Sequence, residues 1–400
     1  MNSKIVTGLL SLAAGTLLAP AAHAAEIKLD GGIKAKDADK GYAFELDGRV
    51  MWDFAVFDND DNGGQNVSGS EFRRIRLTAK GSAFGWNYVI QPDFAGDGVT
   101  MKDVYIGKGL GRIGKLKLGQ FKVPFGLEEL TSSKYITIQE RSAAAGIASS
   151  HQMGVGLFGH GNGLSWGAAA YNLDSNDDDV NNGTGLGGRL TFAPVDTDTV
   201  TVHLGAALAQ ESVGKSADDG DNSRFRVRYR AAGHLSDESR PTLIDLNNGR
   251  RSDVGKVGIE LAGVFGPVSL QSEYAVADAE DGVDEGETSA YYLQLSGFLT
   301  GERRPYKAKA GTFDKVKPKN PGGAWELALR FDHAEGEYGP IGGVLDSDTE
   351  LDIVTVGVNW YANANVRVML NYWTAEITDQ LSNTTTDEPK AITGRVQIHF

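Results

Sequence analysis

The chain has 400 residues, with 39 basic and 53 acidic side chains, a formal charge of −14, 52 glycines and no cysteine. The lack of cysteine excludes disulfide bonds, zinc–cysteine sites, iron–sulfur clusters and thiol nucleophiles, and the acidic balance excludes a general nucleic-acid binder, which needs basic surface. Abundant glycine without collagen periodicity favours many strands and turns.

The first 24 residues have the pattern of a secretory signal peptide. Lys4 precedes an apolar run, and small residues around Ala22 and Ala24 resemble a cleavage site. We therefore predict that residues 1–24 are removed and that residues 25–400 form one exported domain. No later stretch reaches the ~18 consecutive apolar residues of a membrane helix, which leaves the periplasm or a β-barrel in the outer membrane of a Gram-negative bacterium.

From residue 40 onward apolar and polar residues alternate. Phe44 and Trp52 share one parity, whereas Glu45 and Arg49 share the other, and similar alternation continues to Phe400. Aromatic residues near strand ends are typical of the interfacial girdles of transmembrane barrels, and the candidates are Trp52, Trp86, Tyr105, Trp325, Trp360 and Tyr372. The pattern predicts an all-β, transmembrane antiparallel β-barrel. Even strand numbers are the rule in such barrels, so we round 17 or 18 candidate strands to 16.

Acidic clusters fall in the predicted connections. They account for more than the whole net charge, so the rest of the chain is slightly basic. The clusters are Asp58, Asp60 and Asp61; Asp174 and 177–179; Asp218, Asp219 and Asp221; Asp278, Glu280, Asp281, Asp284, Glu285 and Glu287; and Asp346, Asp348, Glu350 and Asp352.

Four arginines alternate with apolar residues: Arg224, Arg226, Arg228 and Arg230. In a wall strand the apolar set would face lipid, and the arginines would form a ladder along the lumen at ~6.6–6.8 Å spacing. Rings of basic side chains select anions. The alternative is that the arginines pair with acids on neighbouring strands.

Two further segments are basic. Residues 303–319 form a lysine-rich connection, which is either functional or a solvated loop. Around residue 75, Arg74 and Arg76 oppose the parity of Ile75, so both should face inward, whereas Arg73 requires a bulge or a rim position.

About thirty residues before Met153 fit neither period, and we predict that this loop folds inward and narrows the lumen.

Motifs for other chemistry are weak. Residues 163–167 match G-x-S-x-G but lie within an alternating strand, and the Asp58–Gly63 segment lacks the glutamate of a calcium loop. The histidines show no metal-ligand spacing. We therefore predict no enzymatic activity, no catalytic residue, no cofactor and no metal site.

Four segments together resemble the phosphate-selective porins O and P of Gram-negative outer membranes. They are EFRRIRL (71–77), GQFKVPFGLEELTSSKYITIQER (119–141), LTGERRPYKAKAGTFDKVKPKNPGGAWELALRFD (299–332) and VGVNWYANANVRVMLNY (356–372). The resemblance implies a 16-stranded barrel with an inward-folded constriction loop, assembled as a homotrimer among outer-membrane lipid and lipopolysaccharide. It also implies passive uptake of inorganic phosphate or related anions.

The resemblance also implies roles for particular residues. An anion-binding constriction would comprise Arg49, Arg73, Arg74, Ser132, Ser133, Lys134 and Arg141. The arginine ladder would comprise Arg224, Arg226, Arg228 and Arg230, extended by Arg250 or Arg251. Lysine clusters at the two mouths would include Lys28, Lys40, Lys307 and Lys317.

Three acidic residues depart from the phosphate-specific pattern, which has lysine where this chain has Glu129, Asp30 and Glu45. A carboxylate in place of an ammonium weakens the potential that an anion meets. We therefore expect an anion-favouring porin for phosphate or pyrophosphate-type solutes. The alternatives are a general or weakly cation-favouring porin and a non-transporting barrel that acts as an anchor or adhesin.

Overall fold

The structure is a computed structural model, and it describes residues 26–29, 31–37, 39–173, 183–214 and 225–400. The predicted signal peptide, Asp30, Arg224 and the acidic clusters at 174–179 and 218–221 lie outside these ranges. Nearly all of the described regular structure is β-strand, and no helix in it is long and apolar enough to cross a membrane.

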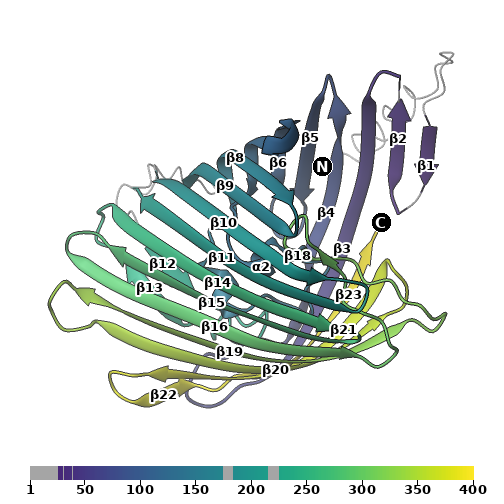
Figure 1. Ribbon diagram of the computed structural model, residues 1–400. Coiled ribbons are helices and arrows are strands. Elements are labelled where there is room, and N and C mark those ends of the chain that lie inside the picture. The colour runs from purple at the N-terminus through teal and green to yellow at the C-terminus, as the bar shows by residue number, and fades with distance from the viewer. Residues whose placement is uncertain (1–25, 30, 38, 174–182, 215–224) are drawn as a thin grey trace, which may run out of the picture.

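Sixteen strands form a closed antiparallel barrel, as predicted (Figure 1). Neighbours in the chain pair all the way round, and β23 then pairs with β3 from Lys390 opposite Asp58 to His399 opposite Arg49. The strands are β3 (Tyr42–Asp58), β4 (Gly69–Ala83), β5 (Trp86–Asp93), β6 (Thr100–Gly109), β7 (Lys115–Lys122), β8 (His151–Gly161), β9 (Leu164–Leu173), β10 (Gly183–Asp196), β11 (Val200–Val213), β14 (Ser252–Phe265), β15 (Val268–Glu280), β16 (Asp284–Phe298), β19 (Ala324–Pro340), β20 (Ser347–Tyr361), β21 (Val366–Asp379) and β23 (Lys390–His399).

The two ends of the barrel differ. One end, called the short-turn end below, carries tight turns such as Phe84–Gly85 and Asn162–Gly163; the other, the long-loop end, carries most of the long connections. The remaining elements are small. The strands β1 (Glu26–Leu29) and β2 (Ile33–Asp37) extend the sheet beside the start of β3, and β22 (Thr384–Asp387) and η1 (Gly111–Ile113) lie in short connections. The connections 123–150, 214–251 and 299–323 contain six described elements: α2 (Leu127–Leu130), η2 (Ala143–Ile147), β12 (Phe225–Arg228) with β13 (Thr242–Leu246), and β17 (Tyr306–Lys307) with β18 (Thr312–Phe313).

The two faces of the wall follow the alternation of the sequence. On β14 the exposed Val257, Ile259 and Leu261 alternate with buried Lys256 and Glu260. Apolar residues therefore cover the outside of the barrel, and charged residues point into the lumen.

The predicted aromatic girdle is correct for the tryptophans of β19 and β20 and wrong for Tyr105. Trp325 and Trp360 stack on the outer face, with ring centroids 5.9 Å apart. Tyr105 instead points into the lumen and packs against Phe121, because it has the opposite parity to the lipid-facing Ile106.

The long connection between β7 and β8 folds into the lumen, as predicted. Arg367 of β21 donates hydrogen bonds to the carbonyl oxygens of Ile136 and Thr137, at 2.6 and 2.8 Å. Asn359 of β20 also donates to Thr137 O, at 3.0 Å. Ile138 is fully buried. The loop is therefore fastened to the wall opposite its own strands.

The arginine segment corrects our prediction of a wall strand. β12 pairs only with β13, in a two-stranded sheet separate from the barrel. Phe225 and Val227 are buried in the cluster that fills the lumen, rather than facing lipid. A hairpin that packs one face against lumenal side chains has the same two-residue period as a barrel strand, so alternation could not separate the two.

The lysine-rich connection 299–323 joins β16 to β19 at the short-turn end and also turns inward. Tyr306 contacts His203 of β11, with its hydroxyl 2.6 Å from Nδ1. The backbone N–H of Phe313 donates to Oγ1 of Thr131 in the inward loop at 3.3 Å. This connection therefore supports the constriction loop from one side.

The acidic clusters at 278–287 and 346–352 correct our placement of acids in connections. Asp278, Glu287 and Glu350 lie on strands β15, β16 and β20, because these strands extend beyond the apolar band at the long-loop end.

Replacing Arg367 should loosen the inward loop without opening the barrel. Hydrogen bonds from a charged donor contribute ~1.5–3 kcal/mol each, so Arg367→Met should raise single-channel conductance and current noise. The heat-resistant gel mobility of the folded barrel should stay as in the wild type. Arg112→Met, at an exposed arginine of η1, is the matched control. Unchanged conductance in Arg367→Met would contradict this role of the loop.

Candidate functional site: the constriction

A cavity of about 340 Å³ lies between the inward loop and the wall of β3 to β7. It brings together every predicted constriction residue except Lys134. Its lining residues are Arg49, Arg73, Arg74, Arg76, Gln91, Lys102, Asp103, Lys122, Glu129, Leu130, Ser132, Ser133, Arg141, Ser150 and His151.

Arg49 of β3 lies against two hydroxyl groups of the inward loop. Its Nη1 donates to Oγ of Ser133 at 2.9 Å and of Ser132 at 3.4 Å. Within the described ranges no carboxylate lies at ion-pair distance from Arg49. Because a serine hydroxyl accepts from arginine and can donate its own proton, this group offers an anion both charge and hydrogen bonds.

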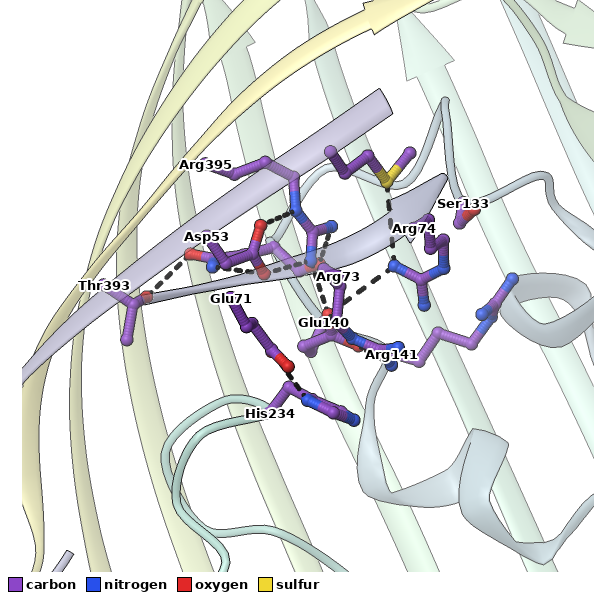
Figure 2. A network of polar contacts seen from close by, with 12 residues as sticks. Asp53, Glu71, Arg73, Arg74, Ser133, Glu140, Arg141, His234, Thr393 and Arg395 are labelled. Atoms are coloured by element: carbon purple, nitrogen blue, oxygen red, sulfur yellow. Dashed lines mark hydrogen bonds and ion pairs between the residues drawn. The ribbon is translucent and has the colours of Figure 1, made fainter. Parts of the chain in front are cut away.

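Arg73 and Arg74 of β4 converge on Glu140 of the inward loop (Figure 2). Arg73 makes two hydrogen bonds to the carboxylate, at 3.0 and 3.2 Å. Arg74 Nη1 lies 3.7 Å from it, and the buried Arg74 Nε has no partner in the described parts of the chain. The register of β3 and β4 shifts at this point, so that Arg73 occupies a bulge, as predicted.

Arg395 of β23 adds a third guanidinium to this group. It pairs with Glu140 at 2.5 Å and with Asp53 at 2.7 Å, all three side chains being largely buried. Burial opposes ionisation of Glu140, but the charges of Arg73, Arg74 and Arg395 hold its pKa well below the usual range. Three arginines against two carboxylates leave this network with net positive charge.

Glu129 is neutralised by two cations of the same cavity. Its carboxylate lies 2.7 Å from Lys122 Nζ and 3.1 Å from Arg141 Nε. Burial disfavours the charged form, yet Arg141 and Lys122 outweigh it and lower the pKa of Glu129 to about 2. The acidic departure in the loop is thus an ionised carboxylate held by neighbouring cations.

Three basic residues of the cavity were absent from the predicted constriction. Arg76 pairs with Asp93 at 2.6 Å, Lys122 ends β7, and Lys102 lies on β6. The parity of Arg76 already indicated that it faces inward. Lys102 and Lys122 carry no comparable signal, because their position depends on how β6 and β7 meet the loop.

The hairpin β12–β13 carries part of the predicted ladder to the long-loop side of the constriction. Arg228, Arg230 and Arg240 line a cavity of about 210 Å³ together with Arg73, Arg74 and Arg141. Nε of Arg228 and of Arg240 is buried without a partner among the described residues. Arg230 pairs with the exposed Asp237 at 2.9 Å.

Other predicted ladder residues lie apart from this cavity. Arg226 is exposed on β12, and Arg250 and Arg251 are exposed before β14, where Arg251 donates to Ser212 Oγ at 3.3 Å. Lys134 follows the serine pair and lies outside the constriction cavity.

The four mouth lysines gather at one end rather than two. Lys28 lies on β1 and Lys40 follows β2, both beside the start of β3, and Lys307 and Lys317 belong to the connection 299–323. Both segments lie at the short-turn end. Nearby, Glu45 lies 3.3 Å from Lys80, so this acidic departure is also paired.

A third cavity, of about 440 Å³, lies on the short-turn side of the constriction. It shares Asp103, Lys122 and Leu130 with the constriction cavity, which in turn shares Arg73, Arg74 and Arg141 with the cavity at the hairpin. The three cavities therefore adjoin one another, and basic side chains outnumber acidic ones in the lining of each.

A closed 16-stranded barrel with an apolar outside and a polar lumen narrowed by a loop defines an outer-membrane porin. Residues 44–400 match the model of the family "Phosphate-selective porin O and P". The chain is 31% identical to Porin O of Pseudomonas aeruginosa over 399 residues, which cover 90% of this chain and 89% of that protein. The chain belongs to the phosphate-selective porin O and P family.

Solved porin structures share the fold. An anion-selective porin from Comamonas acidovorans matches with a TM-score of 0.57 and 14% identity, over 90% of this chain and all of that one. The outer-membrane protein OmpT of Vibrio cholerae, in its trimer form, matches with a TM-score of 0.52 and 12% identity, over 90% of this chain and all of that one.

Removing the charge of Glu129 should strengthen anion binding. Glu129→Gln leaves Lys122 and Arg141 without their carboxylate, and one charge in a partly aqueous pore corresponds to ~1 kcal/mol. The phosphate concentration that blocks half of the chloride current should fall about fivefold. Glu335→Gln, on the exposed outer face of β19, is the control. A higher blocking concentration in Glu129→Gln would contradict this assignment.

Lys134 should make anion preference depend on pH. Burial, followed by repulsion from Arg49, lowers the pKa of Lys134 to about 8. Its positive charge is therefore present below pH 8 and lost above it, so the chloride-to-potassium permeability ratio should fall about twofold between pH 7 and 9. Lys134→Arg should flatten this profile. The assignment fails if the permeability ratio of Lys134→Met depends on pH in the same way as that of the wild type.

Proposed function

We propose that the protein is a porin through which anions diffuse passively across the outer membrane, with phosphate-type anions as preferred solutes. The observation that carries the proposal is the series of three adjoining cavities lined mainly by basic charges, in which Arg49, Ser132 and Ser133 meet at the constriction. Family membership and the 31% identity to Porin O support the same class of solute.

The mechanism rests on electrostatics and hydrogen bonding, without covalent chemistry. The hairpin arginines raise the local anion concentration at the long-loop side, which is extracellular in barrels with short periplasmic turns. At the constriction Arg49 with the two hydroxyls replaces part of the hydration shell. Glu129 and Glu140 compete for the neighbouring cations, so that the anion is held weakly and can leave.

Three further features belong to the proposal. Residues 1–24 are cleaved during export, in keeping with their signal-peptide pattern. The mature protein assembles as a homotrimer, which the trimer form of OmpT supports. Its apolar outer face contacts outer-membrane lipid, and the acidic strand ends at the long-loop side lie at the level of lipopolysaccharide.

A second candidate is a general or weakly cation-favouring porin. Glu129 and Glu140 favour it, because both are ionised carboxylates at or beside the constriction. A planar bilayer with a KCl gradient separates the two candidates by the sign of the reversal potential. A cation-signed potential would overturn the proposal. Absence of conductance would instead support a non-transporting barrel that acts as an anchor or adhesin.

Arg49 provides a sharper test. Arg49→Gln should weaken phosphate block of the chloride current about tenfold, because a charged hydrogen-bond donor contributes ~1.5–3 kcal/mol. The double variant Ser132→Ala, Ser133→Ala should weaken it less, since Arg49 remains. Arg112→Gln serves as the control for loss of an arginine. Equal block in Arg49→Gln and wild type would remove this residue from the site.

A further inference from the structure

The cavity on the short-turn side of the constriction differs in chemistry from the other two. Its volume of about 440 Å³ lies within the ~300–1,000 Å³ range of small-molecule sites. It is bounded by β7, β8, β9, the inward loop and the connection 299–323. Unlike the constriction, it combines an apolar wall with basic side chains.

Phe158, Pro124 and Leu130 make the apolar wall. The ring of Phe158 packs edge-to-face against Phe121, with ring centroids 5.6 Å apart. Phe121 in turn packs edge-to-face against Tyr105, with ring centroids 6.4 Å apart. Three interlocking rings therefore hold the aromatic surface of Phe158 in a fixed orientation toward the cavity.

Lys115, Lys117 and Lys309 supply positive charge beside this wall. Lys117 Nζ lies 4.4 Å from the ring centroid of Phe158. Within the described ranges none of the three lysines has a carboxylate at ion-pair distance, and Asp103 is the single carboxylate that lines the cavity there. At the constriction, by contrast, Glu129 and Glu140 already occupy several of the cations.

We propose that this cavity is a second binding site, which selects anions that carry a flat apolar group, such as aromatic phosphate monoesters. The oxyanion lies among Lys115, Lys117 and Lys309, and the ring packs on Phe158. A small inorganic anion satisfies the lysines but leaves the aromatic wall in contact with water. The inference rests on the proposed function, because it requires that anions enter the lumen.

The test compares two phosphate esters of equal charge, phenyl phosphate and methyl phosphate. Each is added at the short-turn side of the full-length protein in a planar bilayer, and block of the chloride current is measured. Aromatic contacts beyond simple burial correspond to a factor of about three to ten. The half-blocking concentration of phenyl phosphate should be lower than that of methyl phosphate by this factor.

Two variants locate the effect. Phe158→Leu keeps apolar volume but removes the ring. Block of the chloride current by phenyl phosphate should therefore weaken until its half-blocking concentration equals that of methyl phosphate. Lys117→Gln should weaken block by both esters. The control is Lys108→Gln, because Lys108 lies over the Trp86 ring at 5.3 Å on the outside of the same end; it should retain the difference between the esters.

The outcomes separate this inference from the proposed function. A cation-signed reversal potential in the wild type would overturn both. An anion-signed potential with equal block by the two esters would overturn the second site alone. A preference for phenyl phosphate that survives in Phe158→Leu would likewise overturn it, since the ring would then bind elsewhere.

Discussion

The carboxylate of Glu140 is the point on which the shape of the pore depends. It stands near the end of the inward loop, and Arg73, Arg74 and Arg395 converge on it from β4 and β23. β23 is also the strand that closes the barrel against β3. A buried charge left without its partner costs several kcal/mol, so departure of the loop would leave Glu140, Arg73 and Arg74 without their ion-pair partners, whereas Arg395 would keep Asp53. The strand that closes the wall therefore also holds the constriction loop in place.

The same carboxylates that fix the arginines also limit how tightly an anion binds. Arg73, Arg74, Arg141 and Lys122 each have a protein carboxylate within ion-pair distance, so a passing anion must share them. Arg49 is different, since its partners are hydroxyls. A cation that contacts only hydroxyls, beside cations shared with carboxylates, gives a site that recognises an anion and still releases it, which conduction requires. An acidic residue at a constriction therefore does not by itself reverse selectivity when two cations surround it.

The sequence predicted those features that depend on strand parity. Arg49 and Arg74 point inward because their neighbours are lipid-facing, and Arg73 could keep its place beside Arg74 only through a bulge. Parity could not distinguish a wall strand from the lumenal hairpin β12–β13, since both bury one face against apolar groups. Strand parity also could not predict that Lys102 and Lys122 lie at the constriction. Their position depends on which loop folds against β6 and β7, and no local pattern in those strands indicates that. Contacts between distant segments, rather than periodicity, placed Lys307 and Lys317 at the same end as Lys28.

The net charge of −14 is compatible with an anion pathway because charges act locally. On the outer face at the long-loop end, Glu335 pairs in register with Glu350 and Glu337 with Asp348, an arrangement that is self-repulsive. These acids are exposed or half-exposed to solvent, where interactions are screened beyond ~8 Å at physiological salt. The lumenal arginines and lysines lie on the other side of the wall, in narrow spaces where the field is screened much less. An anion inside the barrel therefore responds to the cations that line its route and hardly at all to the acids that set the sign of the total.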